Sequence, residues 1–190
     1  MPFGTVPRSS PRSEPGVQPE LSGAKARLRP WRPDDADAVL AACQDPEIQR
    51  WTTVPSPYTR QDAVAYVTAV APQAWDDGGA VFAVEDAATG ELAGSIGAHG
   101  MSDGVAHVGY WTAPAARGKG LTSDALRTLA RWFLEERGAA RVELVVEPAN
   151  TSSVRVAEAA GFTAEGVLRQ RMVLRGRRAD VVMYSRLPGD

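Results

Sequence analysis

The segment 111–122 constrains the fold more than any other part of the chain, because a strand end, a proline turn and a glycine-rich basic loop follow one another there. A helix is predicted to begin directly after the loop. This order turns several backbone N–H groups toward one point at the helix N-terminus, where phosphate groups bind. Gly118 and Gly120 let the backbone approach a ligand closely, and Arg117 and Lys119 add charge that suits phosphate oxygens. The segment therefore predicts an α/β domain with a phosphate or pyrophosphate site.

Two familiar phosphate-binding motifs do not fit this loop. A Walker-type loop ends in Gly-Lys-Ser/Thr, whereas Gly120 follows Lys119 here, and Ala113 stands where that motif needs an earlier glycine. A dinucleotide-binding fingerprint needs a third glycine and an early place in the domain, and the segment has neither. A general pyrophosphate-binding loop remains, with a purely structural helix-entry turn as the alternative.

Composition limits the classes of function. The 190 residues suggest one domain, and a net charge of −2 provides no basic field for nucleic acid. A single cysteine, Cys43, excludes an internal disulfide and a multi-cysteine metal site, and we expect no metal. The sequence shows neither an apolar run of membrane-spanning length nor an apolar leader, so we expect no membrane partner and a cytoplasmic location.

The predicted elements describe one mixed domain after a tail. Residues 1–24 are rich in Pro and Ser and have little to bury, so they are predicted to be disordered, with docking on a partner as the alternative. Periodicity predicts strands at 26–31, 80–85, 92–99, 105–112, 141–146, 162–169 and 179–186, and helices from 33 and over 59–75, 120–137 and 151–160. The runs between 80 and 112 are typical of an antiparallel meander. The folded domain, residues 25–187, is therefore predicted to be α/β (α+β), with a mixed, mostly antiparallel sheet of about seven strands flanked by about four helices.

This order of elements, with a phosphate loop after the fourth strand, resembles the GNAT family of acyl-CoA-dependent N-acyltransferases. Residues 117–122 match the family's Arg/Gln-x-x-Gly-x-Gly/Ala loop, except that Thr122 replaces a small residue. Further marks resemble the branch of ribosomal-protein alanine N-acetyltransferases (RimJ/RimL-like). They are Leu28-Arg29-Pro30, Gly109-Tyr110-Trp111, Asn150-Thr151-Ser152-Ser153, Gly161-Phe162, Glu165-Gly166-Val167-Leu168-Arg169 and the late Asp180 to Tyr184. The resemblance runs from Lys25 to Leu187.

The resemblance implies a GNAT fold and an enzyme that moves an acetyl group from acetyl-CoA to a primary amine, either a protein N-terminal α-amine or a small amine. Relatives often form homodimers, so the resemblance also allows a homodimer. The residues implied to bind acetyl-CoA are Trp111, Thr112, Arg117, Gly118, Lys119, Gly120, Leu121, Thr122, Asn150 and Ser153. In the family the fourth strand splays from the fifth, and here the backbone groups of Trp111 and Thr112 would then meet the pantetheine and the thioester carbonyl.

Two of these residues are implied to take part in catalysis. Trp111 would act through its backbone, and Ser153 would bond to the departing thiolate or protonate it. Structural alternatives remain for both residues and for Asn150: core packing for Trp111, a helix N-cap for Asn150, and a capping or exposed position for Ser153. Many family members use a tyrosine further along this helix, where the chain has Ala157.

The sequence does not identify a general base. Some relatives place a carboxylate shortly after the Gly-Phe strand, but residues 169–172 contain none. The open candidates are Glu85, His99, Asp103, His107 and Asp180, and direct attack by a neutral amine, with a water chain removing the proton, is the alternative. An α-amine has a reference pKa of about 7.7–8.0 and needs less help from a base than a lysine side chain, whose pKa is about 10.4.

Other classes of function stay open. A non-catalytic acyl-CoA-binding or regulatory module would share the loop and lack a base. A longer acyl-CoA donor also remains open, because the sequence does not reveal the size of the pocket around the thioester. A nucleic-acid-binding protein would depend on the cluster Arg169, Arg171, Arg175, Arg177 and Arg178. Such a cluster is more typical of a solvated hairpin or a substrate-side rim, so no nucleic-acid partner is expected.

Overall fold

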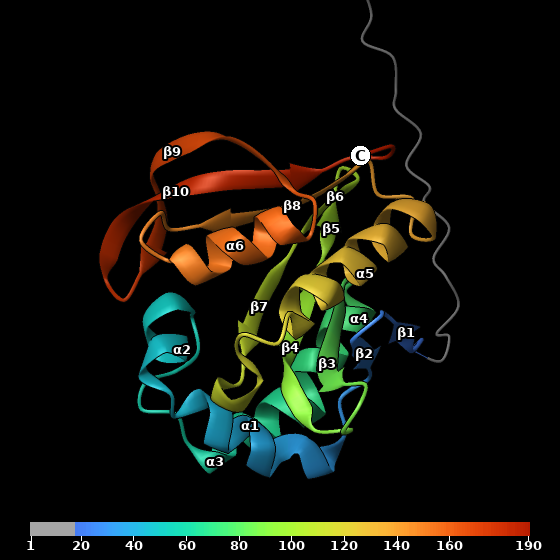
Figure 1. Ribbon diagram of the computed structural model, residues 1–190. Helices are drawn as coiled ribbons and strands as arrows, with labels where there is room; N and C mark the ends of the chain where they lie inside the picture. Colours follow the sequence, from blue (N-terminus) through green and yellow to red (C-terminus); the bar gives the residue numbers. More distant parts are fainter. Residues whose placement is uncertain (1–17) are drawn as a thin grey trace, which may run out of the picture.

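Two five-stranded sheets form the centre of the domain in the computed structural model, which describes residues 18–190 (Figure 1). The strands are β1 (Leu21–Ser22), β2 (Ala26–Arg29), β3 (Ala80–Asp86), β4 (Leu92–Ala98), β5 (Met101–Ser102), β6 (Val105–His107), β7 (Gly109–Thr112), β8 (Arg141–Val146), β9 (Thr163–Leu174) and β10 (Arg177–Arg186). The first sheet has the order β1-β2-β3-β4-β7, and the second has the order β5-β6-β8-β10-β9 with one parallel pair, β6 and β8. The predicted α/β (α+β) class with mostly antiparallel pairing is confirmed, but the strands are divided between two sheets.

The predicted strand 105–112 connects the two sheets. It breaks at Val108 into β6, which pairs with β8, and β7, which pairs with β4. The Val108 N–H still donates to the Glu143 carbonyl (2.8 Å), and beyond this bond the described strands β7 and β8 share no backbone pairing. The two strands therefore diverge after Val108 (Figure 1), as the family resemblance implied.

Helices cover both sheets. They are α1 (Ala36–Cys43), α2 (Pro46–Trp51), α3 (Arg60–Ala65), α4 (Ala71–Asp76), α5 (Leu121–Glu135) and α6 (Thr151–Ala159), with turns η1 (Pro33–Asp35), η2 (Tyr66–Val70) and η3 (Pro114–Ala116). Thr59 and Asp62 cap α3 reciprocally, as expected for the start of the predicted helix 59–75. This helix widens to a π-helical turn over η2 just before Pro72, which has no N–H to continue the regular bonding.

The sequence analysis missed α2, a helix of six residues. Its start signal is local: Asp45 accepts a hydrogen bond from the Ile48 N–H (2.9 Å), and Pro46 occupies the first helical position. The segment is too short for its apolar residues to show a helical period. This omission matters because α2 forms one wall of the cleft described below.

The core fixes the direction of α5. The residues predicted on its apolar face are all buried: Leu121, Ala125, Leu129, Trp132 and Phe133. Trp132 packs against Phe82 (5.8 Å between ring centroids) and Trp75 (6.0 Å) beneath the first sheet. Because α5 is held over its whole length, its N-terminus and the loop before it have a defined position.

The N-terminal boundary differs from the prediction. Residues 1–17 of the predicted disordered tail lie outside the described residues. The prediction of disorder is wrong for Leu21 and Ser22, which form β1 and pair with Leu28 and Arg27 of β2. The edge of β2 supplies backbone partners to a segment that has few apolar side chains, a contribution that composition does not reveal.

Within residues 18–190, no helix combines the length and the apolar character needed to cross a membrane.

Candidate active site

The glycine-rich loop, residues 117–120, leads into α5 with donors turned outward. Gly118 (φ 76°) and Gly120 (φ 78°) both adopt left-handed backbone, which glycine reaches without strain. Gly120 is the N-cap of α5, and no side chain caps the helix there. The Asp124 N–H makes a bond to the Gly120 carbonyl (3.1 Å), so the N–H groups of residues 121–123 have no intrahelical acceptor. This geometry provides the donors and the helix dipole that an anion requires.

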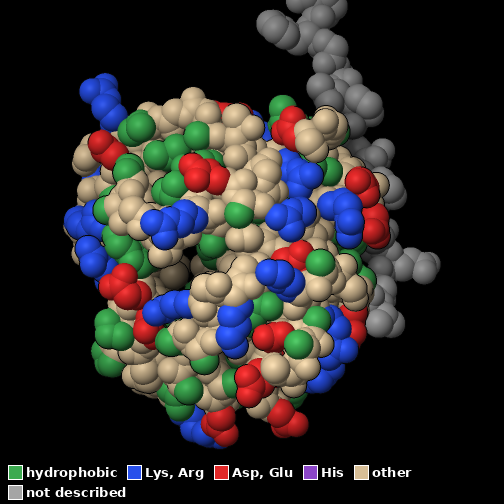
Figure 2. Space-filling view, in the orientation of Figure 1, with side chains coloured by type: hydrophobic (Ala, Val, Ile, Leu, Met, Phe, Trp, Pro, Cys, Tyr) green, Lys and Arg blue, Asp and Glu red, His purple; other side chains and the backbone are tan. Residues whose placement is uncertain are grey.

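A cleft of about 460 Å³ opens beside this loop. Its walls come from α2, β7, the loop, the first turn of α5, and α6 (Figure 1). Nine of the ten predicted ligand-binding residues line it: Trp111, Thr112, Arg117, Gly118, Gly120, Leu121, Thr122, Asn150 and Ser153. Figure 2 shows a hollow on this face, between the positions of α2 and α6 in Figure 1, with Lys and Arg side chains near its edge.

The backbone of β7 is open on the side of the cleft. The Ala113 N–H donates to the Ala93 carbonyl (2.8 Å), which directs Ala113 toward β4. Donors in an antiparallel ladder alternate in direction, so Trp111 also turns its backbone groups toward β4. The N–H and C=O groups of Tyr110 and Thr112 therefore point to the opposite side, where β8 has diverged.

The backbone groups of Trp111 face β4 rather than the cleft, although the residue lines the cleft as predicted. Its carbonyl oxygen lies against Gly94 of β4, where an added Cβ would come within 2.2 Å of it. Its indole is buried and packs 6.4 Å from the ring of Trp31. Tyr110, rather than Trp111, turns its backbone groups away from β4. The sequence did not predict this, because it does not reveal which residues of β7 bond to β4.

Two hydroxyl groups meet where the strands diverge. The Tyr110 Oη lies 2.9 Å from the Ser153 Oγ and donates to the Ser153 carbonyl at 3.3 Å. Asn150 is the N-cap of α6, and its side chain accepts the Ser153 N–H (3.1 Å), which fixes Ser153 in place. Burial raises the pKa of Tyr110 to about 12, so its phenol keeps its proton at neutral pH. The pair can donate a hydrogen bond to an atom in the cleft.

Side chains of the loop region hold it to its neighbours. The Thr122 Oγ1 lies 2.6 Å from the Thr112 Oγ1, so the larger side chain at this position rests against β7. Arg117 pairs with Asp45 at the start of α2 (2.6 Å), and this bond lowers the pKa of the Asp45 carboxyl. Lys119 is exposed and does not line the cleft, unlike the other predicted ligand-binding residues.

Comparison with known proteins now decides the family. The acetyltransferase (GNAT) domain family matches residues 25–163. The chain belongs to the GNAT acetyltransferase family. A Bacillus subtilis relative named Uncharacterized N-acetyltransferase YoaA is 28% identical over 169 residues, which are 88% of this chain and 96% of the relative. The ribosomal-protein-serine acetyltransferase of Escherichia coli is 32% identical over 82 residues, which are 43% of this chain and 46% of the relative.

Solved structures share the fold of this N-acetyltransferase. RimL, a ribosomal L7/L12 α-N-protein acetyltransferase in complex with coenzyme A, has a TM-score of 0.78 at 21% identity and covers 89% of this chain and 98% of its own. RimJ of Mycobacterium smegmatis, in complex with CoA-disulfide, has a TM-score of 0.79 at 21% identity and covers 90% of this chain and 88% of its own. The predicted family and GNAT fold are confirmed, and the relatives agree with the RimJ/RimL-like branch.

The base candidates that the sequence offered for this acetyltransferase do not line the described cleft. His107, for example, lies on β6 with its Nδ1 2.8 Å from Glu143, and Asp180 accepts the Gln170 N–H (2.8 Å) on the last hairpin. The carboxylate among the residues that line the cleft is Glu47 of α2, which was missed together with its helix. Nowhere in the described part of the chain do three His, Cys, Asp or Glu side chains gather in a way that could hold a metal ion.

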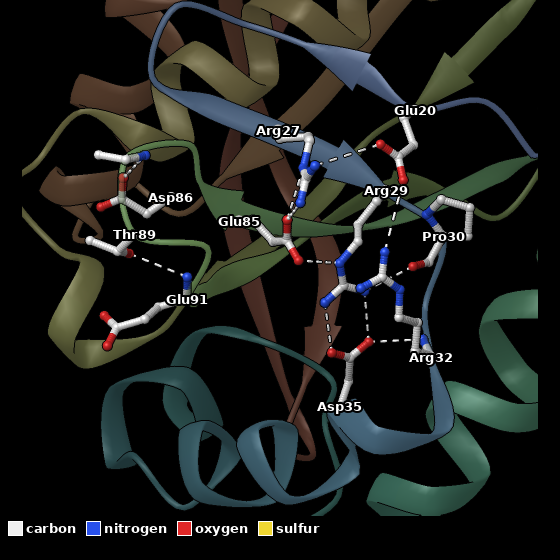
Figure 3. Close-up of polar contacts among 11 residues, drawn as sticks. Glu20, Arg27, Arg29, Pro30, Arg32, Asp35, Glu85, Asp86, Thr89 and Glu91 are labelled. Carbon is white, nitrogen blue, oxygen red and sulfur yellow. Dashed lines mark hydrogen bonds and ion pairs between the residues drawn. The ribbon is translucent and has the colours of Figure 1, made fainter.

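Glu85 belongs to a buried charge network rather than to the cleft (Figure 3). It accepts hydrogen bonds from Arg27 (2.9 Å) and Arg29, and Arg29 also pairs with Asp35 (2.7 Å). Arg29 and Glu85 are each only 4% exposed. Burial favours the neutral carboxyl, but the bonds from Arg29 and Arg27 outweigh it and hold the pKa of Glu85 below its ordinary value. The network fixes β2, β3 and η1 to one another.

We expect Glu85→Gln to destabilise the protein by about 2–3 kcal/mol, because buried Arg29 would keep Asp35 as its only carboxylate partner and lose its charged bond to Glu85. Urea unfolding at pH 7 measures this loss. The stabilisation from Glu85 is present above the carboxyl's unfolded pKa of about 4.3 and declines as the pH falls below it, so the difference between variant and wild type should shrink below pH 4. The exposed Glu91→Gln is the control, and kcat should stay unchanged in both variants. A stable Glu85→Gln protein with a large loss of kcat would restore Glu85 as a base.

The predicted arginine cluster is partly engaged within the protein. Arg175 donates to the carbonyls of Gln49 (2.8 Å) and Val54 (2.6 Å), and Arg177 pairs with the buried Glu147 (2.8 Å). Arg175 ties the β9–β10 hairpin to α2 and the segment after it, next to the cleft, and Arg177 ties the hairpin to the residue that follows β8. The hairpin therefore borders the α2 wall of the cleft.

Proposed function

We propose that acetyl-CoA lies along the cleft, with its pyrophosphate at the glycine-rich loop and its thioester beside Tyr110 and Ser153, and that the acceptor is the α-amine of a protein N-terminus. The observation that supports this most strongly is that one cleft joins the outward N–H groups at the start of α5 to the Tyr110–Ser153 hydroxyl pair. A pyrophosphate needs the first feature, and a departing thiolate needs the second. The family membership fits the same ligand.

In the proposed reaction, the thioester lies beside the unpaired edge of β7. The amine nitrogen attacks the thioester carbonyl carbon, and the C–S bond breaks as the amide forms. An outward N–H of Tyr110 or Thr112 donates to the carbonyl oxygen while it carries negative charge. The Ser153 hydroxyl, bonded to Tyr110, donates its proton to the departing sulfur and is reprotonated from solvent. The proton that the amine loses also passes to solvent.

The charges around the cleft favour an α-amine over a polycation. Arg117 and Arg155 line the cleft, and Glu47 is the carboxylate among its lining residues. A polyamine or aminoglycoside usually calls for an acidic cleft, which this arrangement does not provide. An α-amine with a pKa of about 7.7–8.0 is partly neutral at pH 7 and can attack without a strong base. We also propose a cytoplasmic location, which is the compartment where new protein N-termini emerge.

The test is release of free CoA thiol from acetyl-CoA with a panel of acceptors. We expect release with peptides that begin in Ala or Ser, at a rate that rises between pH 6.5 and 8.5 as the α-amine deprotonates. The matched control is the same peptide with a blocked N-terminus and an internal lysine. Release with polyamines or aminoglycosides alone would overturn the acceptor class, and release from propionyl-CoA alone would overturn the donor. A rise in melting temperature with CoA but no release from any pair would favour a non-catalytic CoA-binding module.

A further inference from the structure

The chain contains two lysines, Lys25 and Lys119, and both lie at the glycine-rich loop. The Lys25 Nζ donates to the Lys119 carbonyl oxygen at 3.3 Å. That carbonyl belongs to the peptide unit whose N–H is contributed by Gly120. Lys25 does not line the cleft, so its ammonium contacts the loop outside the space proposed for the ligand.

A buried carboxylate ties Lys25 to α5. The Asp124 Oδ2 accepts the backbone N–H groups of Lys25 (2.8 Å) and Ala26 (3.0 Å), and Asp124 is only 6% exposed. Gly23 permits this approach, since a Cβ there would lie 2.2 Å from the same oxygen. The start of β2 is thus bonded to the first turn of the helix that the loop enters.

The fit between Lys25 and the loop is close. A Cβ added to Gly120 would lie 3.3 Å from the Lys25 Nζ. A long exposed side chain normally samples many rotamers, but here its backbone is anchored and its end is bonded to the Lys119 carbonyl. The ammonium therefore lies beside the backbone of the loop.

We propose that Lys25 is a positioning residue for the glycine-rich loop, which it holds by its bond to the Lys119 carbonyl. This bond polarises the Lys119–Gly120 peptide and makes the Gly120 N–H a stronger donor toward an anion. The positive charge of Lys25 adds to the field of the helix N-terminus in front of it. This inference rests on the proposed function, in which the loop binds the pyrophosphate of acetyl-CoA.

The test compares CoA binding by wild type, Lys25→Met and Lys25→Arg using titration calorimetry. Lys25→Met keeps the aliphatic stem and removes the charge, and we expect the Kd for CoA and the KM for acetyl-CoA to rise about three- to tenfold. The kcat at saturating acetyl-CoA should stay unchanged, because Lys25 does not reach the cleft. Lys25→Arg should restore most of the affinity, and the difference should shrink in high salt. Arg60→Met, which removes an exposed cation paired with Asp37 away from the cleft, is the control.

The outcomes separate the two proposals. If wild type does not bind CoA, the proposed function fails, and the role of Lys25 fails with it. If wild type binds CoA and Lys25→Met binds it equally well, only the role of Lys25 is overturned. Equal losses in Lys25→Met and Lys25→Arg would also overturn it, because they would reflect packing of the stem rather than charge.

Discussion

Gly120→Val is expected to raise the KM for acetyl-CoA about 10- to 100-fold, because a β-branched residue at φ 78° costs about 1–3 kcal/mol and moves the loop out of its binding shape. The new Cβ would also lie 3.3 Å from the Lys25 Nζ, so the side chain that supports the loop must shift. Both effects displace the N–H groups at the start of α5. Initial rates over a range of acetyl-CoA concentrations, at saturating acceptor, measure the change.

Gly90→Val is the matched control for this variant. Gly90 has nearly the same backbone (φ 75°), lies in the turn between β3 and β4, and has open space around its would-be Cβ. It does not line the cleft, so Gly90→Val should lose stability and keep its KM. An unchanged KM for Gly120→Val would remove the loop from CoA binding. Equal rises in KM for both variants would assign the effect to general destabilisation.

The loop could be predicted from sequence because its signals are local. Gly118, Gly120 and the basic residues between strand and helix lie within a few positions of one another, and each limits the backbone or the charge directly. The N-cap role of Asn150 is local in the same way, and the structure shows its side chain on the Ser153 N–H. Nine of the ten residues that the loop motif and the family resemblance assigned to acetyl-CoA binding line one cleft.

What sequence could not supply is long-range geometry. Tyr110 and Ser153 are 43 positions apart, and Lys25 meets Asp124 across 99 positions. The motif Gly109-Tyr110-Trp111 was visible, but the direction of each N–H depends on the register of β7 with β4. Glu47 was missed for a different reason, because α2 is a single short helix whose only clear signal is Asp45 followed by Pro46.

Ser153→Ala is expected to lower kcat about 100-fold and to change the KM for acetyl-CoA little, because the departing thiolate loses its hydroxyl donor. The substitution separates catalysis from helix capping. Asn150 caps α6 through the backbone N–H of Ser153, and alanine keeps that group. A loss of kcat at unchanged melting temperature therefore belongs to the hydroxyl alone, whereas an unchanged kcat would leave Ser153 with only a structural role.

Tyr110→Phe completes the argument, because the two hydroxyls are proposed to act as one unit. Tyr110→Phe should also lower kcat, and the double variant should lose little more than Ser153→Ala, since the second change removes a group whose partner is already gone. Tyr66→Phe is the control. The Tyr66 hydroxyl lies 2.7 Å from the Ser95 Oγ, and burial raises the pKa of Tyr66 to about 12, as it does for Tyr110. Neither Tyr66 nor Ser95 lines the cleft. We expect Tyr66→Phe to keep its kcat. Losses for Tyr110→Phe and Ser153→Ala that multiply in the double variant would show two independent contributions and contradict the pair.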